Sequence, residues 1–402
     1  MERIYLDNNA TSPVVRAVLE SLLPYYKNLY GNPSSLHWAG SETKVALDKA
    51  RAQVAALINA QPDEIIFTAG GSESDNLAIF GSLDALKSKG NHIITTQVEH
   101  PAVLDSCRYY EQQGGSVTYL GVDKLGQIDL SELEAAITDH TVLISIMWAN
   151  NETGVIFPIA EIAEIAQRHQ VRFHCDAVQA LGKVPIDMAT CPVDLLAVSG
   201  HKIGAPKGIG ALYMRQGVKL NPIIHGGHQE HSLRAGTHNV AGIVAFGTAC
   251  QLAQQDLALK VDSLRQLRDR LQQGMLDTLD NVTIIGDLQH RLPNTLNVGF
   301  SFVEGEGLLL SLDMCGIAAS SGSACTSGSD APSHVLTAMQ VDSLLIQSCL
   351  RFSLGYQNTV EEIDKTLEVL PGIVAKLRAM SPMLIEDVDM EHCQYIECVI
   401  DH

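Results

Sequence analysis

One lysine stands where its amine could act as a nucleophile. Lys202 ends the stretch Leu195–Lys202, in which an apolar run of strand length leads into a serine, a glycine and a histidine. Gly204 and Pro206 follow it, so the lysine is expected on a loop at the end of a buried strand. Desolvation at such a position lowers the pKa of a lysine and lets its amine attack a carbonyl carbon. Taken alone, a solvated surface lysine is the commoner alternative.

Polar residues that can do chemistry also follow four other predicted strands. A glycine pair and a serine before a helix would suit a phosphate, because a helix N-terminus offers free N–H groups and the positive end of its dipole. A histidine before a proline could move protons or stack on a flat ring, and a carboxylate ending a core strand needs a partner. In chain order these residues are Gly71 and Ser72, His100, Asn151, and Asp176 with Gln179. Each has an ordinary structural alternative, such as a helix cap or a turn.

The predicted strands alternate with helices, which is typical of an open α/β sheet. Such strands favour parallel pairing, and ligands of these sheets bind beyond the carboxyl ends of the strands. The expected strands are 65–68, 92–97, 117–121, 142–148, 172–175, 195–199 and 210–214, with helices at 14–30, up to 58, 73–88, 101–113, 131–138 and 158–169. The polar strand ends should therefore meet at one edge. Together they match the needs of pyridoxal phosphate, which takes a lysine Schiff base, an acid at its ring nitrogen and a phosphate anchor.

A smaller unit is expected after a long helix at 240–280, which would connect two domains. Its predicted elements are strands 282–285, 295–300, 317–320 and 345–353 and helices 306–314, 333–339 and 360–379. Thr359 and Glu362 form a capping-box pattern ahead of the last helix. The expected organisation is a large domain at 13–260, a small C-terminal α/β domain formed by 1–12 and 261–380, and an acidic tail at 381–402.

Composition limits the partners and the location of the protein. The 402 residues carry a net charge of −19, which argues against nucleic acid and anionic membranes because both attract basic surfaces. No apolar run reaches the length of a membrane span, and the first residues lack the features of a signal or transit peptide. The nine cysteines are scattered, several of them in apolar segments, as in a reducing compartment, so a cytoplasmic location is expected.

One cysteine has surroundings unlike those of the others. Cys325 lies in the run of small polar residues at 320–329, which predicts a mobile, exposed loop. A thiol on such a loop could reach a substrate, although composition alone leaves an ordinary cysteine equally open. Cys393 and Cys398 lie in the tail near His392 and suggest a metal site, but a solvated tail is the simpler alternative.

Several stretches together resemble the fold-type-I pyridoxal-phosphate enzymes, and among them the cysteine desulfurases of the NifS/IscS group. The matching stretches are YLDNNAT (5–11), GNPSSLH (31–37), EHPAVL (99–104), WANNETG (148–154), HCDAVQALGKVPID (174–187), SGHK (199–202), RAGT (234–237), SSGSACTSGS (320–329) and RFSLG (351–355). They span the chain except its tail. GGHQE (226–230) and the stretch around Cys325 favour the nitrogen-fixation-type NifS branch.

The resemblance implies how a bound cofactor would be held. Lys202 would bind it covalently, His100 would stack on its ring and move protons, and Asp176 would pair with the ring nitrogen. Gln179 would bond the ring oxygen, and Asn151 would contact cofactor or substrate. The phosphate would be held by Gly71, Ser72, Ser199 and His201, and by Thr237 from the other subunit of a homodimer.

The same resemblance implies a cysteine desulfurase reaction. Arg351 would clamp the carboxylate of L-cysteine, a bidentate task suited to arginine. Cys325 would take the sulfur as a persulfide, leaving L-alanine, and pass it to an acceptor such as an iron–sulfur scaffold protein. No resident metal is expected, and Cys325 would be at most a transient iron–sulfur ligand. Alternatives are a selenocysteine lyase, a cysteine-sulfinate desulfinase, an aminotransferase, or a scaffold that only relays persulfide.

The chain departs from the family pattern in several loops. The segment 330–333 reads DAPS in place of the usual LEPS, and 231–233 lacks the usual glycine and second arginine. His238 follows RAGT where glutamate is usual, and Tyr356 stands where a basic residue is common. None of these changes removes a catalytic group, so they bear on loop behaviour and subunit contacts.

Overall fold

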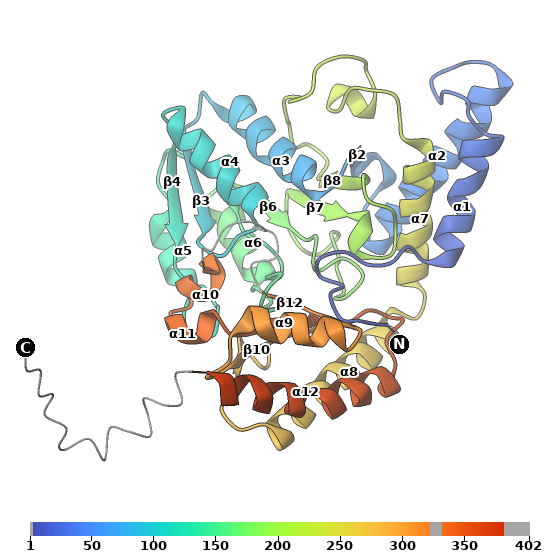
Figure 1. Cartoon of the computed structure of the whole chain (residues 1–402). Helices are drawn as coiled ribbons and strands as arrows, with labels where there is room; N and C mark the ends of the chain where they lie inside the picture. Colours follow the sequence, from blue (N-terminus) through green and yellow to red (C-terminus); the bar gives the residue numbers. More distant parts are fainter. Residues whose placement is uncertain (1–2, 322–331, 382–402) are drawn as a thin grey trace, which may run out of the picture.

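The computed structural model describes residues 3–321 and 332–381, and a large sheet lies at its centre (Figure 1). Within these residues seven strands pair in the order β2-β8-β7-β6-β5-β3-β4. Their bounds are Ile65–Thr68 for β2, His92–Thr96 for β3, Ser116–Leu120 for β4, Thr141–Ser145 for β5, Arg172–Asp176 for β6, Leu195–Ser199 for β7 and Gly210–Met214 for β8. All run in one direction except β8, which is antiparallel to both of its neighbours. The predicted α/β fold with a mainly parallel sheet is confirmed.

Helices cover both faces of this sheet, which explains why most of its strands are buried along their whole length. Leu195 of β7 packs with Leu77 of α3 on one face. The next residue, Leu196, belongs instead to the core on the other face, together with Phe246 of α7. The helices of this unit are α1 (Arg16–Lys27), α2 (Trp38–Leu57), α3 (Gly71–Leu86), α4 (Pro101–Gln112), α5 (Leu130–Ala136), α6 (Ile159–Arg168) and α7 (Val240–Gln254).

A second apolar core belongs to a smaller unit, at the bottom of Figure 1. In the described residues its sheet has the order β12-β13-β10-β9, with antiparallel neighbours. β1 pairs with β11 and brings Ile4 and Leu6 into this core, so the strand predicted at 317–320 is divided between two sheets. The elements of this unit are β1 (Ile4–Tyr5), α8 (Leu257–Thr278), β9 (Val282–Ile285), β10 (Thr295–Phe300), α9 (Gly305–Met314), β11 (Ile317–Ala318), β12 (Ser320–Ser321), β13 (Cys349–Ser353) and α12 (Val360–Met380). Two short helices, α10 (His334–Ala338) and α11 (Ser343–Ile346), pack instead against the core of the large unit. The domain boundary at residue 260 stays a prediction.

Two predicted elements near the smaller unit are wrong in detail. The helix predicted at 240–280 is two helices, because Gln255 is extended and Asp256 adopts a left-handed backbone with φ 56°. α7 therefore stays in the large core, and α8 turns into the small one. The strand predicted at 345–353 starts late, because the side chain of Asp342 accepts from the following backbone N–H groups and begins α11.

The predicted capping box of the last helix is present and offers a test of local stability. The hydroxyl of Thr359 accepts from the N–H of Glu362 at 3.3 Å, and the Glu362 carboxylate accepts from the N–H of Thr359 at 3.1 Å. Thr359→Ala leaves a helix N–H without its acceptor, so we expect the free energy of unfolding to fall by about 1 kcal/mol in urea denaturation. Thr359→Ser keeps the acceptor and should match the wild type. Equal losses in both variants would contradict this role.

Candidate active site

The polar strand ends converge on one cavity of about 220 Å³. The residues that the sequence indicated and that line it are Gly71, Ser72, His100, Asn151, Asp176, Gln179, Ser199, His201 and Lys202. They follow β2, β3, β5, β6 and β7, which are mutually parallel and therefore end at the same edge. Asn9, Ala10 and Asp75 add further polar groups to the lining. The structure thus brings the indicated residues together, while the roles assigned to them stay predictions.

Part of this cavity suits an anion. α3 begins there with Gly71 and Ser72, whose N–H groups precede the first helical hydrogen bonds. A Cβ at Gly71 would lie 2.7 Å from Cγ2 of Val178, so a larger residue would crowd this place. The hydroxyl of Ser199 is buried and has no hydrogen-bond partner among the described residues. A helix N-terminus beside an unpaired buried hydroxyl fits a phosphate group.

Asp176 supplies a carboxylate to the cavity. Its neighbour Cys175 packs in the core on the α7 side, so alternation along β6 turns Asp176 toward the α3 face. Its Oδ1 accepts from the N–H of Val178 at 2.9 Å. Burial raises the pKa of Asp176, whereas His100, this hydrogen bond and Lys202 lower it. A buried carboxylate of this kind is suited to pair with a cationic nitrogen.

His100 is held in one orientation at the start of α4. Its Nδ1 accepts from the N–H of Ala102 at 3.1 Å, which makes it the N-cap of the helix. A nitrogen that accepts carries no proton, so the neutral ring is protonated at Nε2. Burial lowers the pKa of His100, while the charge of Asp176 raises it. The cap thus sets both the place and the tautomer of a ring that could carry a proton.

The N-terminal segment holds the amine of Lys202. In the short 3-10 helix that follows β7, Nζ of Lys202 donates to the carbonyl oxygen of Ala10 at 2.9 Å and to that of Asn9. Nδ1 of His201 lies 3.1 Å from the hydroxyl of Thr11. Burial and the charge of Lys202 lower the pKa of His201 to about 4, so its ring is neutral at pH 7. Sequence reasoning recognised this segment as a motif but assigned it no contact with the lysine.

Comparison with known proteins decides the family. A model of the family described as "Aminotransferase class-V" matches residues 4–366. A "Cysteine desulfurase" of Nostoc sp. is 52% identical over 382 residues, which are 95% of each chain. The "Cysteine desulfurase IscS" of Methanosarcina thermophila is 52% identical over 380 residues, which are 94% of each chain. The chain belongs to the cysteine desulfurases.

Solved structures agree with this assignment to the cysteine desulfurases. A "NIFS-LIKE PROTEIN" superposes with a TM-score of 0.88 at 38% identity, covering 94% of this chain and 100% of that one. A structure titled "SspA in complex with cysteine" has a TM-score of 0.78 at 35% identity, covering 89% and 100%. The predicted family, fold type and cysteine desulfurase function are confirmed by these relatives. Enzymes of this family depend on pyridoxal 5′-phosphate and pass sulfur to acceptor proteins.

Three buried titratable residues of this cysteine desulfurase were missed in the sequence. Asp75 lines the cavity, and burial together with the charges of Asp176 and Glu99 raises its pKa well above the usual range. Burial raises the pKa of Glu99 to about 8 and lowers that of His174 to about 3. Glu99 and His174 are therefore mostly uncharged at pH 7. No signal in the sequence marked Asp75 or His174, because each lies within an ordinary helix or strand.

Some predicted residues do not line the cavity. Arg351 is buried on β13, where Nη2 contacts Oδ1 of Asp7 at 2.7 Å and Nη1 donates to the carbonyl of Asn151 at 3.0 Å. It is thus joined to the cavity through Asn151. Thr237 is exposed and lies outside the cavity lining. The predicted features that fall outside the described residues are Cys325, Cys393, Cys398 and the tail from residue 382.

Removing the unpaired hydroxyl of Ser199 should raise the stability of the protein and lower its affinity for the cofactor. Removing a buried hydroxyl that lacks a partner relieves its desolvation cost, so Ser199→Ala should stabilise the cofactor-free protein by about 1 kcal/mol. The same change removes an anion ligand and should weaken pyridoxal 5′-phosphate binding roughly tenfold. Calorimetry and absorbance titration measure the two effects.

Ser82 provides the matched control. Its hydroxyl is also buried and unpartnered in α3, but Ser82 does not line the cavity. Ser82→Ala should raise stability without changing cofactor affinity. An unchanged affinity in Ser199→Ala would contradict the phosphate assignment.

Proposed function

We propose that this protein binds pyridoxal 5′-phosphate, converts L-cysteine to L-alanine and moves the sulfur to Cys325. The observation that carries the proposal is the single cavity in which Lys202, Asp176 and the start of α3 meet. A reactive amine, an acid and an anion anchor are the contacts that this cofactor requires. The solved relative whose title names a complex with cysteine supports cysteine as the substrate.

Each group of the cavity has a task in this proposal. When bound, the cofactor supplies an electron sink that stabilises negative charge on the α-carbon of the substrate. Lys202 holds the cofactor covalently and, once released, removes the α-proton with Nζ. Asp176 pairs with the ring nitrogen, and His100 stacks on the ring. Gln179 bonds the ring oxygen, and Asn151 contacts cofactor or substrate. The residues that hold the phosphate are Gly71, Ser72, Ser199 and His201.

The sulfur transfer balances without an external oxidant. The thiolate of Cys325 forms a bond to the sulfur of cysteine while the Cβ–S bond of cysteine breaks. The electron pair left on Cβ takes a proton and the α-carbon regains the one that Lys202 removed, which yields L-alanine, and Cys325 carries the persulfide. An acceptor protein, which we propose to be an iron–sulfur scaffold, then takes the sulfur. Cys325 would serve at most as a transient ligand of the cluster.

Arg351 receives the substrate carboxylate in this proposal. Its guanidinium is paired with Asp7, and its Nε has no hydrogen-bond partner among the described residues. A carboxylate that reaches Arg351 therefore competes with Asp7 for the same guanidinium. Such an exchange keeps the buried charge compensated throughout.

We also propose a cytoplasmic location without membrane or nucleic-acid partners. No helix in residues 3–321 and 332–381 is long and apolar enough to cross a bilayer. The net charge of −19 disfavours nucleic acid and anionic lipid.

Replacing the sulfur acceptor separates this activity from its alternatives. Cys325→Ala should keep the absorbance of the bound cofactor but lose alanine release from L-cysteine, because no thiolate remains to take the sulfur. Cys315→Ala, which removes a partly exposed free cysteine of the small unit, should leave the activity unchanged. Normal alanine release by Cys325→Ala would favour a selenocysteine lyase or a sulfinate desulfinase, and a colourless wild-type protein would favour a persulfide relay.

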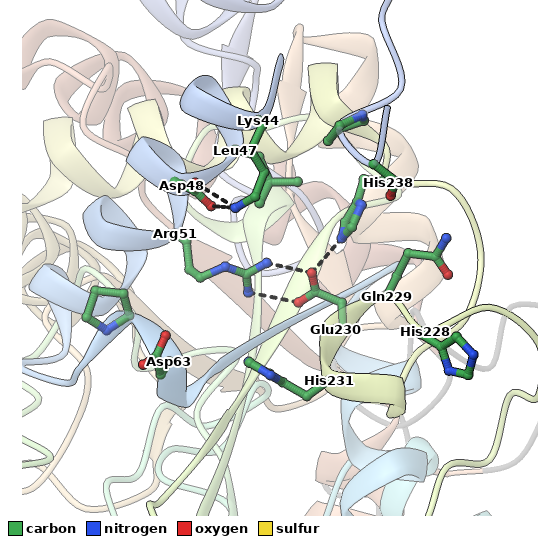
Figure 2. A pocket seen from close by; sticks show the side chains of 13 residues that line it. Lys44, Leu47, Asp48, Arg51, Asp63, His228, Gln229, Glu230, His231 and His238 are labelled. Atoms are coloured by element: carbon green, nitrogen blue, oxygen red, sulfur yellow. Dashed lines mark hydrogen bonds and ion pairs between the residues drawn. The ribbon is translucent and has the colours of Figure 1, made fainter. Parts of the chain in front are cut away.

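A second cleft, of about 900 Å³, borders the segment that carries Thr237. It lies between α2 and the segment from His228 to His238 (Figure 2). Glu230 anchors this segment, since its carboxylate accepts from Nη1 of Arg51 at 2.8 Å and from the N–H of Phe67 at 2.7 Å, and lies 2.7 Å from Nε2 of His238. Thr237 itself is exposed, but these contacts of Glu230 fix the segment that carries it.

Apolar side chains are exposed on the neighbouring helices α1 and α2 and on the segment between them. The most exposed of them are Tyr26, Tyr30, Leu36, Trp38 and Val45. Exposed apolar side chains on adjoining elements are typical of an interaction site. We propose that a second copy of the chain covers it and that Thr237 of each subunit reaches the cofactor phosphate of the other.

Mixed dimers test whether Thr237 acts on the neighbouring subunit. Lys202→Ala removes the reactive amine, and Thr237→Glu sets a carboxylate against the phosphate, so each variant alone should be inactive. If Thr237 acts across the interface, unfolding and refolding the two variants together should restore roughly a quarter of the wild-type sites. No recovery, with dimers present in light scattering, would place Thr237 in its own subunit's site, and an active Thr237→Glu variant would place it in neither site.

A further inference from the structure

A second lysine lies buried behind the active-site cavity and has no task in the proposed reaction. Lys183 is only 5% exposed and lies on the turn segment that follows β6. Its Nζ lies 3.0 Å from Oε1 of Gln179 and 3.4 Å from Oδ1 of Asn9. Both acceptors line the cavity, whereas Lys183 does not. Because burying an amine is costly, its interactions with two cavity residues point to a function.

We propose that Lys183 is a positioning residue that orients the Gln179 amide so that an N–H group, and not the oxygen, faces the cavity. An ammonium group has donors only, so the amide oxygen must turn toward Lys183. The amide Nε2 then donates to the carbonyl oxygen of Asn9 at 3.0 Å. Since an amide nitrogen carries two hydrogens, one is left for a ligand. A flipped amide would set NH2 against the lysine and oxygen against the Asn9 carbonyl.

The other acceptor of Lys183 is held just as firmly. Oδ1 of Asn9 also accepts from Nδ2 of Asn294 at 3.1 Å. Nδ2 of Asn9 donates to the hydroxyl of Thr295 at 2.8 Å and to the carbonyl of Asn151 at 3.1 Å. The Asn9 side chain is therefore fixed and keeps Nζ of Lys183 beside Oε1 of Gln179, so the amide keeps one orientation.

This orientation holds in both protonation states of Lys183. Burial, with the positive charges of Lys202 and Arg351, lowers the pKa of Lys183 to about 7. An ammonium group and a neutral amine both donate hydrogen, so either form can hold the Gln179 oxygen. The charged form also favours a negatively charged ligand atom in the cavity, next to the N–H group of the amide. That this atom is the ring oxygen of pyridoxal 5′-phosphate rests on the proposed function.

Cofactor affinity of a lysine variant tests the proposal. Lys183→Met keeps the length and apolar packing of the side chain but removes its donor, so the Gln179 amide can flip. We expect the dissociation constant of pyridoxal 5′-phosphate, titrated into the cofactor-free full-length protein, to rise roughly tenfold. Lys207→Met removes a charge from an exposed site near the cavity and should leave the affinity unchanged. Equal affinities of the wild type and Lys183→Met would overturn the proposal.

A double-mutant cycle shows whether Lys183 acts through Gln179. In a Gln179→Leu background no amide remains to be oriented, so adding Lys183→Met should change the dissociation constant no further. The same fold-change in both backgrounds would mean that Lys183 acts independently of Gln179, against the proposal. A thermal unfolding curve of each cofactor-free variant shows that it is folded.

A variant of Gln179 keeps the test decisive if Lys183→Met does not fold. Gln179→Glu still pairs with Lys183 but offers no N–H to the cavity, so it should bind the cofactor as weakly as Gln179→Leu. Wild-type affinity in Gln179→Glu would overturn the proposal. A wild-type protein that does not bind pyridoxal 5′-phosphate would instead overturn the proposed function together with this inference.

Discussion

The contact between Lys202 and the carbonyl oxygens of Asn9 and Ala10 is the interaction on which the site depends. Lysine is a long and flexible side chain, and a cavity alone would leave its amine many positions. The two carbonyl oxygens limit that freedom and place the amine beside the acid and the anion-binding helix start. The backbone N–H of Ser12 also donates to the carbonyl of His201 at 2.9 Å, so the two segments are joined along their backbones.

Charge compensation explains how so many ionisable groups share one interior. Burial keeps Glu99 and His174 mostly uncharged at pH 7 and raises the pKa of Asp75, so fewer ions have to be solvated in the interior. The groups that remain charged lie beside partners, as Arg351 does beside Asp7. The positive charge near the cavity then suits a ligand that carries phosphate and carboxylate groups.

Much of this arrangement could be predicted from the sequence, and the reason is geometric. Residues that directly follow strands of a parallel sheet meet at one edge, so Asp176 and Lys202 could be placed together without knowledge of their contacts. The contact of Asn9 with Lys202 could not be predicted, because it joins positions that are far apart in the chain. Lys183 was hidden for another reason, since a lysine four residues after Gln179 looks like an ordinary surface charge until its burial is known.

The break between α7 and α8 could not be predicted from the sequence pattern either. A continuous amphipathic pattern across Asp256 favours one helix, and only the competition between two apolar cores decides that the chain turns there. The role of Cys325 likewise rests on its resemblance to the family, since the structure does not describe residues 322–331.

The attachment of the N-terminal segment to the small unit has a mechanical consequence. The N–H of Asn9 donates to the hydroxyl of Ser353 at 2.9 Å, and the Asn8 side chain donates to the Ser353 carbonyl at 3.0 Å. The segment whose oxygens hold Lys202 is therefore attached to β13 of the small unit as well as to the large unit. A rotation of the small unit would therefore pull on the segment that holds the amine of Lys202. Motion between the two units would thus change how the amine of Lys202 is held.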